Sequence, residues 1–171
     1  PPYHHPDPKT LMRPVFILAL ASCLASADVW TDTFRIDRVA LPPGVDPQIG
    51  GIDTTPDGNL AMCFHRGEIF LYNPGADTWK RFAEGLHEPL GLLAESESSF
   101  LVMQRPELTR VADTDGDGVA DLYETDFDSF GMTGNYHEFA FGPTRDREGN
   151  LYLSLGTASN GAGIRKEVRG R

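Results

Sequence analysis

The sequence has little positive charge. It contains 15 Lys and Arg residues against 25 Asp and Glu residues, so its formal net charge is −10 and its pI is near 4.8. A surface of this sign repels phosphate groups. The composition therefore argues against nucleic acid or an anionic membrane surface as a partner.

The sequence also lacks an apolar run long enough to cross a membrane, for which about 20 residues are needed. The segment MRPVFILALASCLASADVW, from Met12, has one positive charge, a short apolar run and Ala-Ser-Ala before Asp28. This order is typical of a secretory signal peptide. We predict that residues 1–27 are upstream residues plus a signal peptide, and that residues 28–171 are exported to the periplasm or cell envelope.

Cysteine is scarce, with two residues in the chain. The stretch Leu20-Ala21-Ser22-Cys23 resembles a bacterial lipoprotein box, so lipidation of Cys23 is an alternative to cleavage after Ala27. Either way Cys63 has no partner for an internal disulfide. Alternation in NLAMCFH puts Ala61 and Cys63 on one face of a strand, which favours a buried structural thiol.

Glycine and proline are plentiful, at 18 and 13 residues, and 40% of the chain is hydrophobic, which suits a turn-rich β protein with a core. Residues 51–73 and 90–113 each read as three short strands joined by tight turns, and residues 139–161 begin the same pattern. Gly51 and Gly91 are 40 residues apart, and Gly142 follows after 51 more. A period near 40 with several strands per unit is typical of β-propeller blades.

We therefore predict an all-β fold, a partial β-propeller of about three blades. A closed propeller has about 4–8 blades, so the chain reads as the N-terminal part of a longer protein. A two-sheet sandwich is the alternative fold. Leu151, Leu153 and Leu155 alternate as expected for a strand packed between sheets.

The stretch ADTDGDGVADLYETDF, residues 112–127, follows the calcium-loop pattern of an EF-hand. Counted from Asp113, acidic residues stand at positions 1, 3, 5, 9 and 12, and Gly118 stands at the sharp turn of position 6. Calcium takes about six to eight oxygen ligands, which such a loop can gather. The predicted ligands are the side chains of Asp113, Asp115, Asp117, Asp121 and Glu124 and the carbonyl of Val119. The alternative is a solvated acidic turn.

The loop does not have the surroundings of a calcium sensor, which needs helices on both sides and usually a second hand. Pro106 precedes a strand-like stretch upstream, and the sequence after the loop allows at most a short helix before Gly131. We predict a structural calcium site in an insertion, residues 112–134, on a blade hairpin.

The segment GNYHEFAFGPTRDREGNLYLSLGTASNG, residues 134–161, resembles the glucose/sorbosone dehydrogenase family of quinoprotein β-propellers. A His before a strand, a Gly-Pro turn and a G-x-[LI]-Y strand carry the resemblance. Together with the acidic loop, the stretch GNYHEFAFGP is similar to large dehydrogenase-like propeller proteins of planctomycetes. The resemblance covers about residues 45–161.

The resemblance implies that His137 is the general base, taking a hydroxyl proton while hydride moves to pyrroloquinoline quinone (PQQ) beside a calcium ion. It also implies that Tyr136, Asn135 and Asn160 line the cofactor site, and that a c-type haem protein accepts the electrons, although this chain has no Cys-x-x-Cys-His. One position departs from the family: Thr157 stands where the sugar dehydrogenases have an Asp that orients the base.

Three functions follow from these observations. The first is a PQQ-dependent oxidoreductase acting on a sugar or alcohol. The second is a non-catalytic, calcium-stabilised propeller that binds ligands, which the missing Asp allows. The third, a calcium-dependent lactonase, ranks last because such enzymes hold calcium by single residues from separate blades.

Overall fold

The computed structural model describes residues 34–130, 135 and 137–156. The chain divides into two units, residues 1–39 and 40–171. In the first unit the described residues 34–39 form no strand, and Arg35 pairs with Asp37 at 2.6 Å. Among the described residues there is no helix long and apolar enough to cross a membrane.

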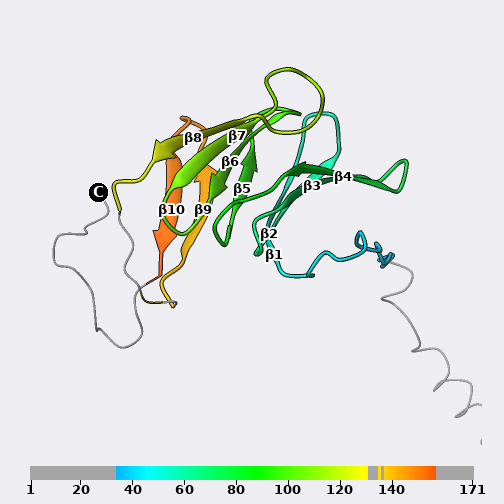
Figure 1. The fold of residues 1–171 in the computed structure, drawn as a ribbon, viewed down its shortest axis with the longest axis horizontal. Helices are drawn as coiled ribbons and strands as arrows, with labels where there is room; N and C mark the ends of the chain where they lie inside the picture. Colours follow the sequence, from blue (N-terminus) through cyan, green and yellow to red (C-terminus); the bar gives the residue numbers. More distant parts are fainter. Residues whose placement is uncertain (1–33, 131–134, 136, 157–171) are drawn as a thin grey trace, which may run out of the picture. The chain divides into compact units, whose positions relative to one another are not determined.

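The second unit consists of three antiparallel sheets (Figure 1). The first sheet has the order β1-β2-β3-β4 and the second β5-β6-β7-β8, while β9 and β10 form a two-stranded sheet. The strands are β1 (Ile49–Thr54), β2 (Leu60–Phe64), β3 (Ile69–Asn73), β4 (Thr78–Ala83), β5 (Leu92–Ala94), β6 (Ser99–Met103), β7 (Leu108–Ala112), β8 (Leu122–Phe127), β9 (Ala140–Arg145) and β10 (Leu151–Leu155).

The all-β prediction is confirmed. Each of the three sequence repeats forms strands of its own sheet. The sequence reading missed β4 and β8, the fourth strands. After the acidic loop the sequence was expected to allow at most a short helix; described residues 121–130 contain no helix, and the stretch forms β8, which pairs with β7. Most side chains of β8 are exposed, which removes the alternation that marks a strand in a sequence.

The tight turns between the strands have a repeated chemistry. In the first sheet Asp57 binds the Asn59 side chain at 2.6 Å, and Gly58 has φ of 86°. In the third sheet Asp146 binds the Asn150 side chain at 2.8 Å, and this hydrogen bond lowers the pKa of Asp146 to about 2. Short Asx-type side chains and a left-handed glycine are what such turns require.

Two apolar layers pack the sheets against one another. Ala61 and Cys63 of β2 lie in the layer between the first and second sheets, whereas Met62 and Phe64 face the opposite side, as the alternation predicted. The layer between the second and third sheets contains Leu101, Met103, Leu108, Phe130 and Ala140, with Leu151, Leu153 and Leu155 of β10 packed on it.

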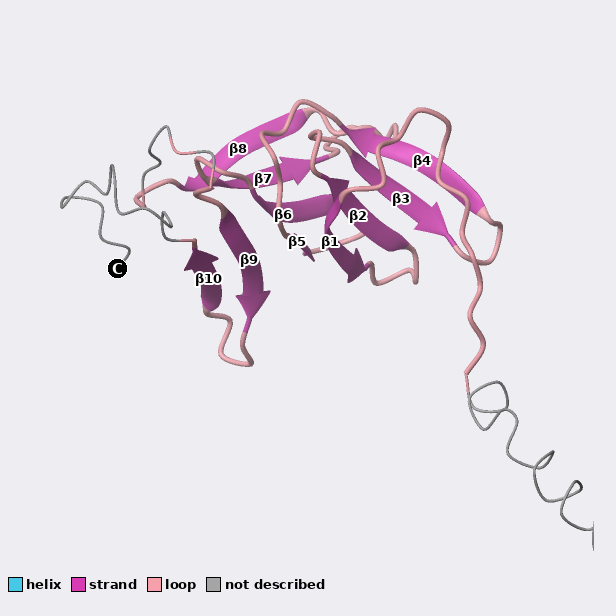
Figure 2. Ribbon diagram, turned by 90° about the horizontal axis from the view of Figure 1, so that it is seen from below, coloured by secondary structure: helices cyan, strands magenta, loops and turns pink. Residues whose placement is uncertain are grey.

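Glycines allow the first strands of the sheets to approach closely. A Cβ atom on Gly51 would lie 2.8 Å from the Cα of Gly91, and one on Gly91 would overlap the carbonyl oxygen of Gly142. Backbone can approach backbone this closely only where a side chain is missing. The three glycines that mark the sequence repeat therefore form one glycine seam. Figure 2 shows β1, β5 and β9 along one side of the unit and β4 and β8 along the other.

Candidate functional site

The acidic loop connects β7 to β8 and gathers three of its predicted ligands. One carboxylate oxygen from each of Asp113, Asp115 and Asp117 lies within 4.8 Å of the others. Asp113 accepts hydrogen bonds of 2.7 Å from the backbone N–H groups of Gly116 and Gly118. Desolvation raises the pKa of Asp113, but these hydrogen bonds outweigh it and hold the pKa below its usual range. Asp113 is therefore a carboxylate at neutral pH, and the cluster could bind a metal ion such as calcium.

The other predicted ligands are placed differently. Asp121 accepts hydrogen bonds from the hydroxyl and the backbone N–H of Thr114, at 2.7 and 2.8 Å, and the hydroxyl contributes most to its lowered pKa. Glu124 lies within β8, opposite Arg110 of β7. Neither carboxylate belongs to the three-membered cluster found among the described residues. Val119 donates its N–H to Asp117 at 2.7 Å.

The acidic loop also joins two sheets. The Lys80 ammonium group of β4 donates to the carbonyl oxygen of Asp117 at 2.8 Å. The N–H of Ala120 donates to the carbonyl oxygen of Phe82 at 2.7 Å, and the Tyr123 hydroxyl donates to that of Glu84 at 3.2 Å. The loop therefore fastens the outer strand of the first sheet to the second sheet.

The predicted base, His137, lies on the segment that leads into β9. Its side chain is exposed, and its backbone N–H donates to the side-chain oxygen of Asn135 at 3.0 Å. The carbonyl oxygen of Asn135 in turn accepts a hydrogen bond of 2.7 Å from Arg105. Tyr136, Asn160 and Thr157, also singled out in the sequence, lie outside the described residues.

Arg105 is the centre of a polar network that sequence reasoning missed. Its side chain is only 10% exposed and donates to Glu88 at 2.7 Å as well as to Asn135. Its guanidinium carbon lies 4.9 Å from the ring centre of Phe139, and the His65 ring centre lies 5.9 Å from that ring. The His65 Nε2 is 3.7 Å from the second oxygen of Glu88. We call His65, Glu88, Arg105, Asn135 and Phe139 the edge network.

One feature of the sequence could have indicated this network. His65 and Arg105 each lie 14 residues after the glycine of their repeat, at the turn that follows the second strand. Their backbone N–H groups make equivalent hydrogen bonds, to the carbonyl oxygens of Gln48 and His87. Gly156 occupies the same position in the third repeat and donates to Phe139 at 2.7 Å. Equal offsets place these residues at the same edge of successive sheets.

The acidic loop and the edge network lie at opposite ends of β7. Arg105 precedes this strand and Asp113 follows it. A strand of five residues spans about 16 Å at about 3.3 Å per residue. A cation in the loop therefore cannot touch a ligand bound at the edge network.

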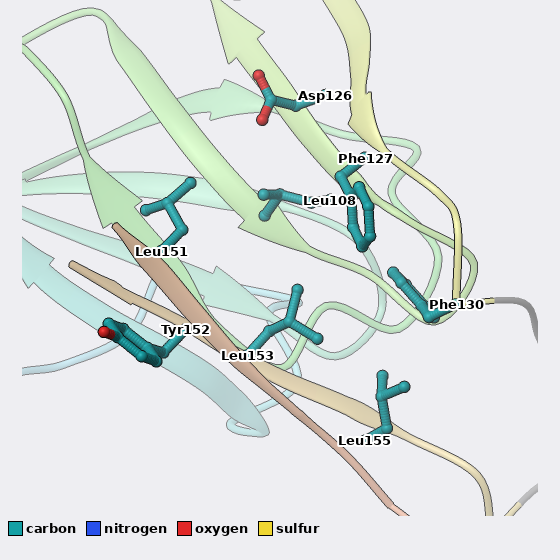
Figure 3. Close-up of a pocket in the computed structure, with 8 residues that line it drawn as sticks. All are labelled: Leu108, Asp126, Phe127, Phe130, Leu151, Tyr152, Leu153 and Leu155. Carbon is teal, nitrogen blue, oxygen red and sulfur yellow. The ribbon is translucent and has the colours of Figure 1, made fainter. Parts of the chain in front are cut away.

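A hollow of about 550 Å³ opens beside β10 (Figure 3). Leu151, Leu153 and Leu155 point toward Leu108, Phe127 and Phe130 across it. Among the described residues, β10 pairs with β9 on one side and with no strand on the other. This surface is apolar and lacks convergent polar groups, unlike the edge network.

Comparison with known proteins assigns a family. Residues 74–170 match the family described as "Domain of unknown function (DUF7133)". The chain belongs to this family. The matched residues include both the acidic loop and the segment with His137. No curated protein matches the chain, and no solved structure matches it.

Membership in the DUF7133 family supplies no activity of its own. The likeness to glucose/sorbosone dehydrogenases stays a prediction from the sequence, and so do the PQQ site and the roles of His137, Asn135, Tyr136 and Asn160. For calcium, the structure shows an acidic cluster that could hold a metal ion.

Proposed function

We propose that the protein is an exported, calcium-stabilised β-propeller that oxidises a sugar or alcohol, in the manner of the PQQ-dependent sugar dehydrogenases that its sequence resembles. The supporting observation is the convergence of turns from three sheets at one edge, where Arg105 holds the segment bearing His137. In this proposal a c-type haem protein is the electron acceptor.

The arrangement of the sheets supports a propeller. The first strands β1, β5 and β9 contact one another in sequence order, while the fourth strands lie on the outside. Blades around a central axis have this order. Edge turns of successive blades then converge on the axis, where a small ligand would meet residues from several blades.

His137 has the chemistry that the proposal requires. A neutral imidazole can accept the proton of a substrate hydroxyl group when it is held within reach of it. The Asn135 side chain fixes the backbone at His137, and Arg105 fixes Asn135 in turn. This anchoring limits the positions that the imidazole can occupy.

The edge network has one Arg or Lys side chain with which to bind an anionic quinone, that of Arg105. PQQ is an anion with several carboxylates, and Arg105 is already neutralised by Glu88. The calcium loop lies about 16 Å away, at the other end of β7. The edge network by itself therefore does not match the charge of PQQ, and two of the predicted cofactor residues, Tyr136 and Asn160, lie outside the described residues.

That disagreement favours a second candidate, a non-catalytic propeller that binds a small ligand at the same edge. In this candidate the edge network binds the ligand. The absence of an Asp at position 157 then has no consequence, because no proton is transferred.

Titration with PQQ separates the two candidates. The dehydrogenase predicts quinone absorbance that is retained on the protein, together with dye reduction in the presence of aldoses, sorbosone or simple polyols. In that case His137→Ala should reduce turnover by about 10²–10⁴-fold without changing the fold. If folded protein neither retains PQQ nor reduces dye, the dehydrogenase is excluded and the non-catalytic binding propeller is the remaining candidate. Lactone hydrolysis would instead indicate the calcium-dependent lactonase.

A further inference from the structure

The edge network contains a second histidine with an oriented carboxylate beside it. His65 Nε2 lies 3.7 Å from one oxygen of Glu88, and the other oxygen of Glu88 accepts a hydrogen bond of 2.7 Å from Arg105. The first distance is longer than a direct hydrogen bond, and a small rotation of either side chain would close it. Such contacts often tighten only when a ligand binds.

Glu88 is held in place at some conformational cost. Its φ is 47°, in the left-handed region that residues other than glycine rarely adopt. Backbone strain of this kind concentrates at functional sites, because the surrounding structure has to maintain it. The Arg105 hydrogen bond holds the pKa of Glu88 below its usual range, so this side chain is a carboxylate at neutral pH.

The burial of Arg105 also points to a built site. Its Nε atom is buried and has no hydrogen-bond partner among the described residues, whereas Nη1 donates to Glu88 and Nη2 to Asn135. A buried polar atom without a hydrogen bond destabilises the folded state. A fold carries this cost more readily where the guanidinium group has a task, which here is to hold both Glu88 and Asn135.

His65 can be reached from solvent. Its side chain is 28% exposed, compared with 10% for Arg105. One face of the imidazole ring is close to Phe139, and its Nε2 faces Glu88, so Nδ1 is the nitrogen left for a ligand.

We propose that His65 is a catalytic proton acceptor of this edge, oriented by Glu88, with Arg105 as a positioning residue. In this step the O–H bond of a ligand hydroxyl breaks, the proton passes to Nδ1 of His65, and the electron pair stays on the ligand oxygen. Glu88 stabilises the imidazolium by its charge. In the sugar dehydrogenases an Asp has this role, and in this chain Thr157 stands at the position of that Asp. The inference rests on the proposed oxidation of an alcohol but assigns its proton to a different histidine.

The first test needs no activity. In ¹⁵N-histidine NMR spectra of the calcium-loaded protein, His65 should carry its proton on Nε2, toward Glu88. His65→Asn assigns the resonance by its loss. Glu88→Gln should change the tautomer because the anionic acceptor is gone. Arg66→Gln is the matched control, since Arg66 lies in the same turn, is 70% exposed and pairs with Asp46 instead. A proton on Nδ1, or a spectrum unaltered by Glu88→Gln, would overturn the proposal.

The second test measures dye reduction with an alcohol substrate. His65→Asn should lower kcat by about 10²–10⁴-fold with little change in KM, and Glu88→Gln should lower kcat by a smaller factor. Full activity in His65→Asn together with its loss in His137→Ala would overturn this inference and leave the proposed function intact. If the unaltered protein reduces no dye, the proposed function and the catalytic role of His65 are both wrong. The NMR experiment tests the hydrogen bond between His65 and Glu88 independently of that result.

Discussion

At the scale of single residues, the glycine seam is the most demanding feature of the packing. Gly91 lies between two other backbones, because the Cβ of Gly51 would meet it on one side and its own Cβ would meet Gly142 on the other. Neither neighbour is a flexible side chain that could move away. Sequence spacing alone identified these glycines as repeat markers, but it could not show that they touch.

We expect Gly91→Ala to destabilise the fold by at least the ~1–3 kcal/mol typical of overpacking. The added methyl group would have to push two sheets apart. Gly75→Ala is the control, because the nearest atom to its Cβ would be the Asn73 side-chain oxygen at 3.4 Å. Urea unfolding of both variants measures the difference. Equal midpoints would show that the sheets are not in contact at Gly91.

Cys63 has an environment that should suppress its reactivity. Its side chain is fully buried next to the glycine seam, and desolvation raises the pKa of its thiol to about 11. The nucleophilic form is the thiolate, which is scarce below that pH. We expect no reaction with an aromatic disulfide reagent at neutral pH until the protein unfolds. Rapid labelling of the folded protein would contradict the buried placement.

The same pKa shift predicts the direction of a pH effect. Between the ordinary value of 9.0 and about 11, the unfolded chain loses the thiol proton and the folded chain keeps it. The folded state then binds more protons than the unfolded state, so its stability falls as the pH rises through this window. Cys63→Ala should reduce this loss of stability, which a series of melting curves can measure.

At the scale of secondary-structure elements, local patterns predicted the inner strands and the acidic loop. Strands β2, β3, β6 and β7 have buried side chains at alternate or successive positions, and tight turns separate the strands. The outer strands carry charged residues, with three of six residues exposed in β4 and four of six in β8, so their sequences were equally compatible with loops. Pairing with a neighbouring strand, rather than local pattern, makes them strands.

The candidate sites divide in the same way. Asp113, Asp115 and Asp117 lie close together in the sequence, so their convergence could be predicted from a motif. The contact of His65 with Glu88 and that of Arg105 with Asn135 join different turns. Such contacts depend on the register of whole sheets, which local patterns do not specify.

Calcium binding to the loop should stabilise the fold. Binding to the native state alone contributes RT ln(1 + [L]/Kd), about 2.7 kcal/mol at a hundredfold excess of calcium over Kd. The loop fastens β4 to the second sheet through Lys80 and Ala120, so the effect should extend to both sheets. Melting curves with calcium and with a chelator measure it, and identical curves would refute the site.

Variants of the loop test its individual ligands. Asp113→Asn should abolish the calcium effect, because it removes a charge from the three-membered cluster. Glu124→Gln should weaken the effect only if the side chain turns from β8 toward the loop on binding. Glu97→Gln, at an exposed position outside the loop, should retain the full response.

At the scale of the whole molecule, the third sheet differs from the other two. It has two described strands where the others have four, and β10 borders the apolar hollow. At the interface of the first two sheets, the third strand of the second sheet covers the equivalent surface, because Val111 of β7 packs in the layer shared with Ile69 and Phe82. In the proposed propeller, a third and a fourth strand would lie beside β10.

We expect residues 28–171 alone to associate at high concentration through β10 and the hollow beside it. Unpaired strand edges and open apolar faces promote such association. A longer polypeptide that supplies the third and fourth strands of this sheet should be monodisperse and unfold in a single transition. Size-exclusion chromatography and urea unfolding of the two chains make the comparison. A monodisperse, cooperatively unfolding 28–171 chain would refute the need for added strands.

The separation of the acidic loop and the edge network by the length of β7 has a thermodynamic consequence. Two ligands influence each other's affinity only through a difference between states that both of them bias. Because each would bind an already folded sheet at its own end, the coupling free energy between calcium and a small ligand should be close to zero. Calcium would then determine how much protein is folded, and leave the affinity of each folded molecule unchanged.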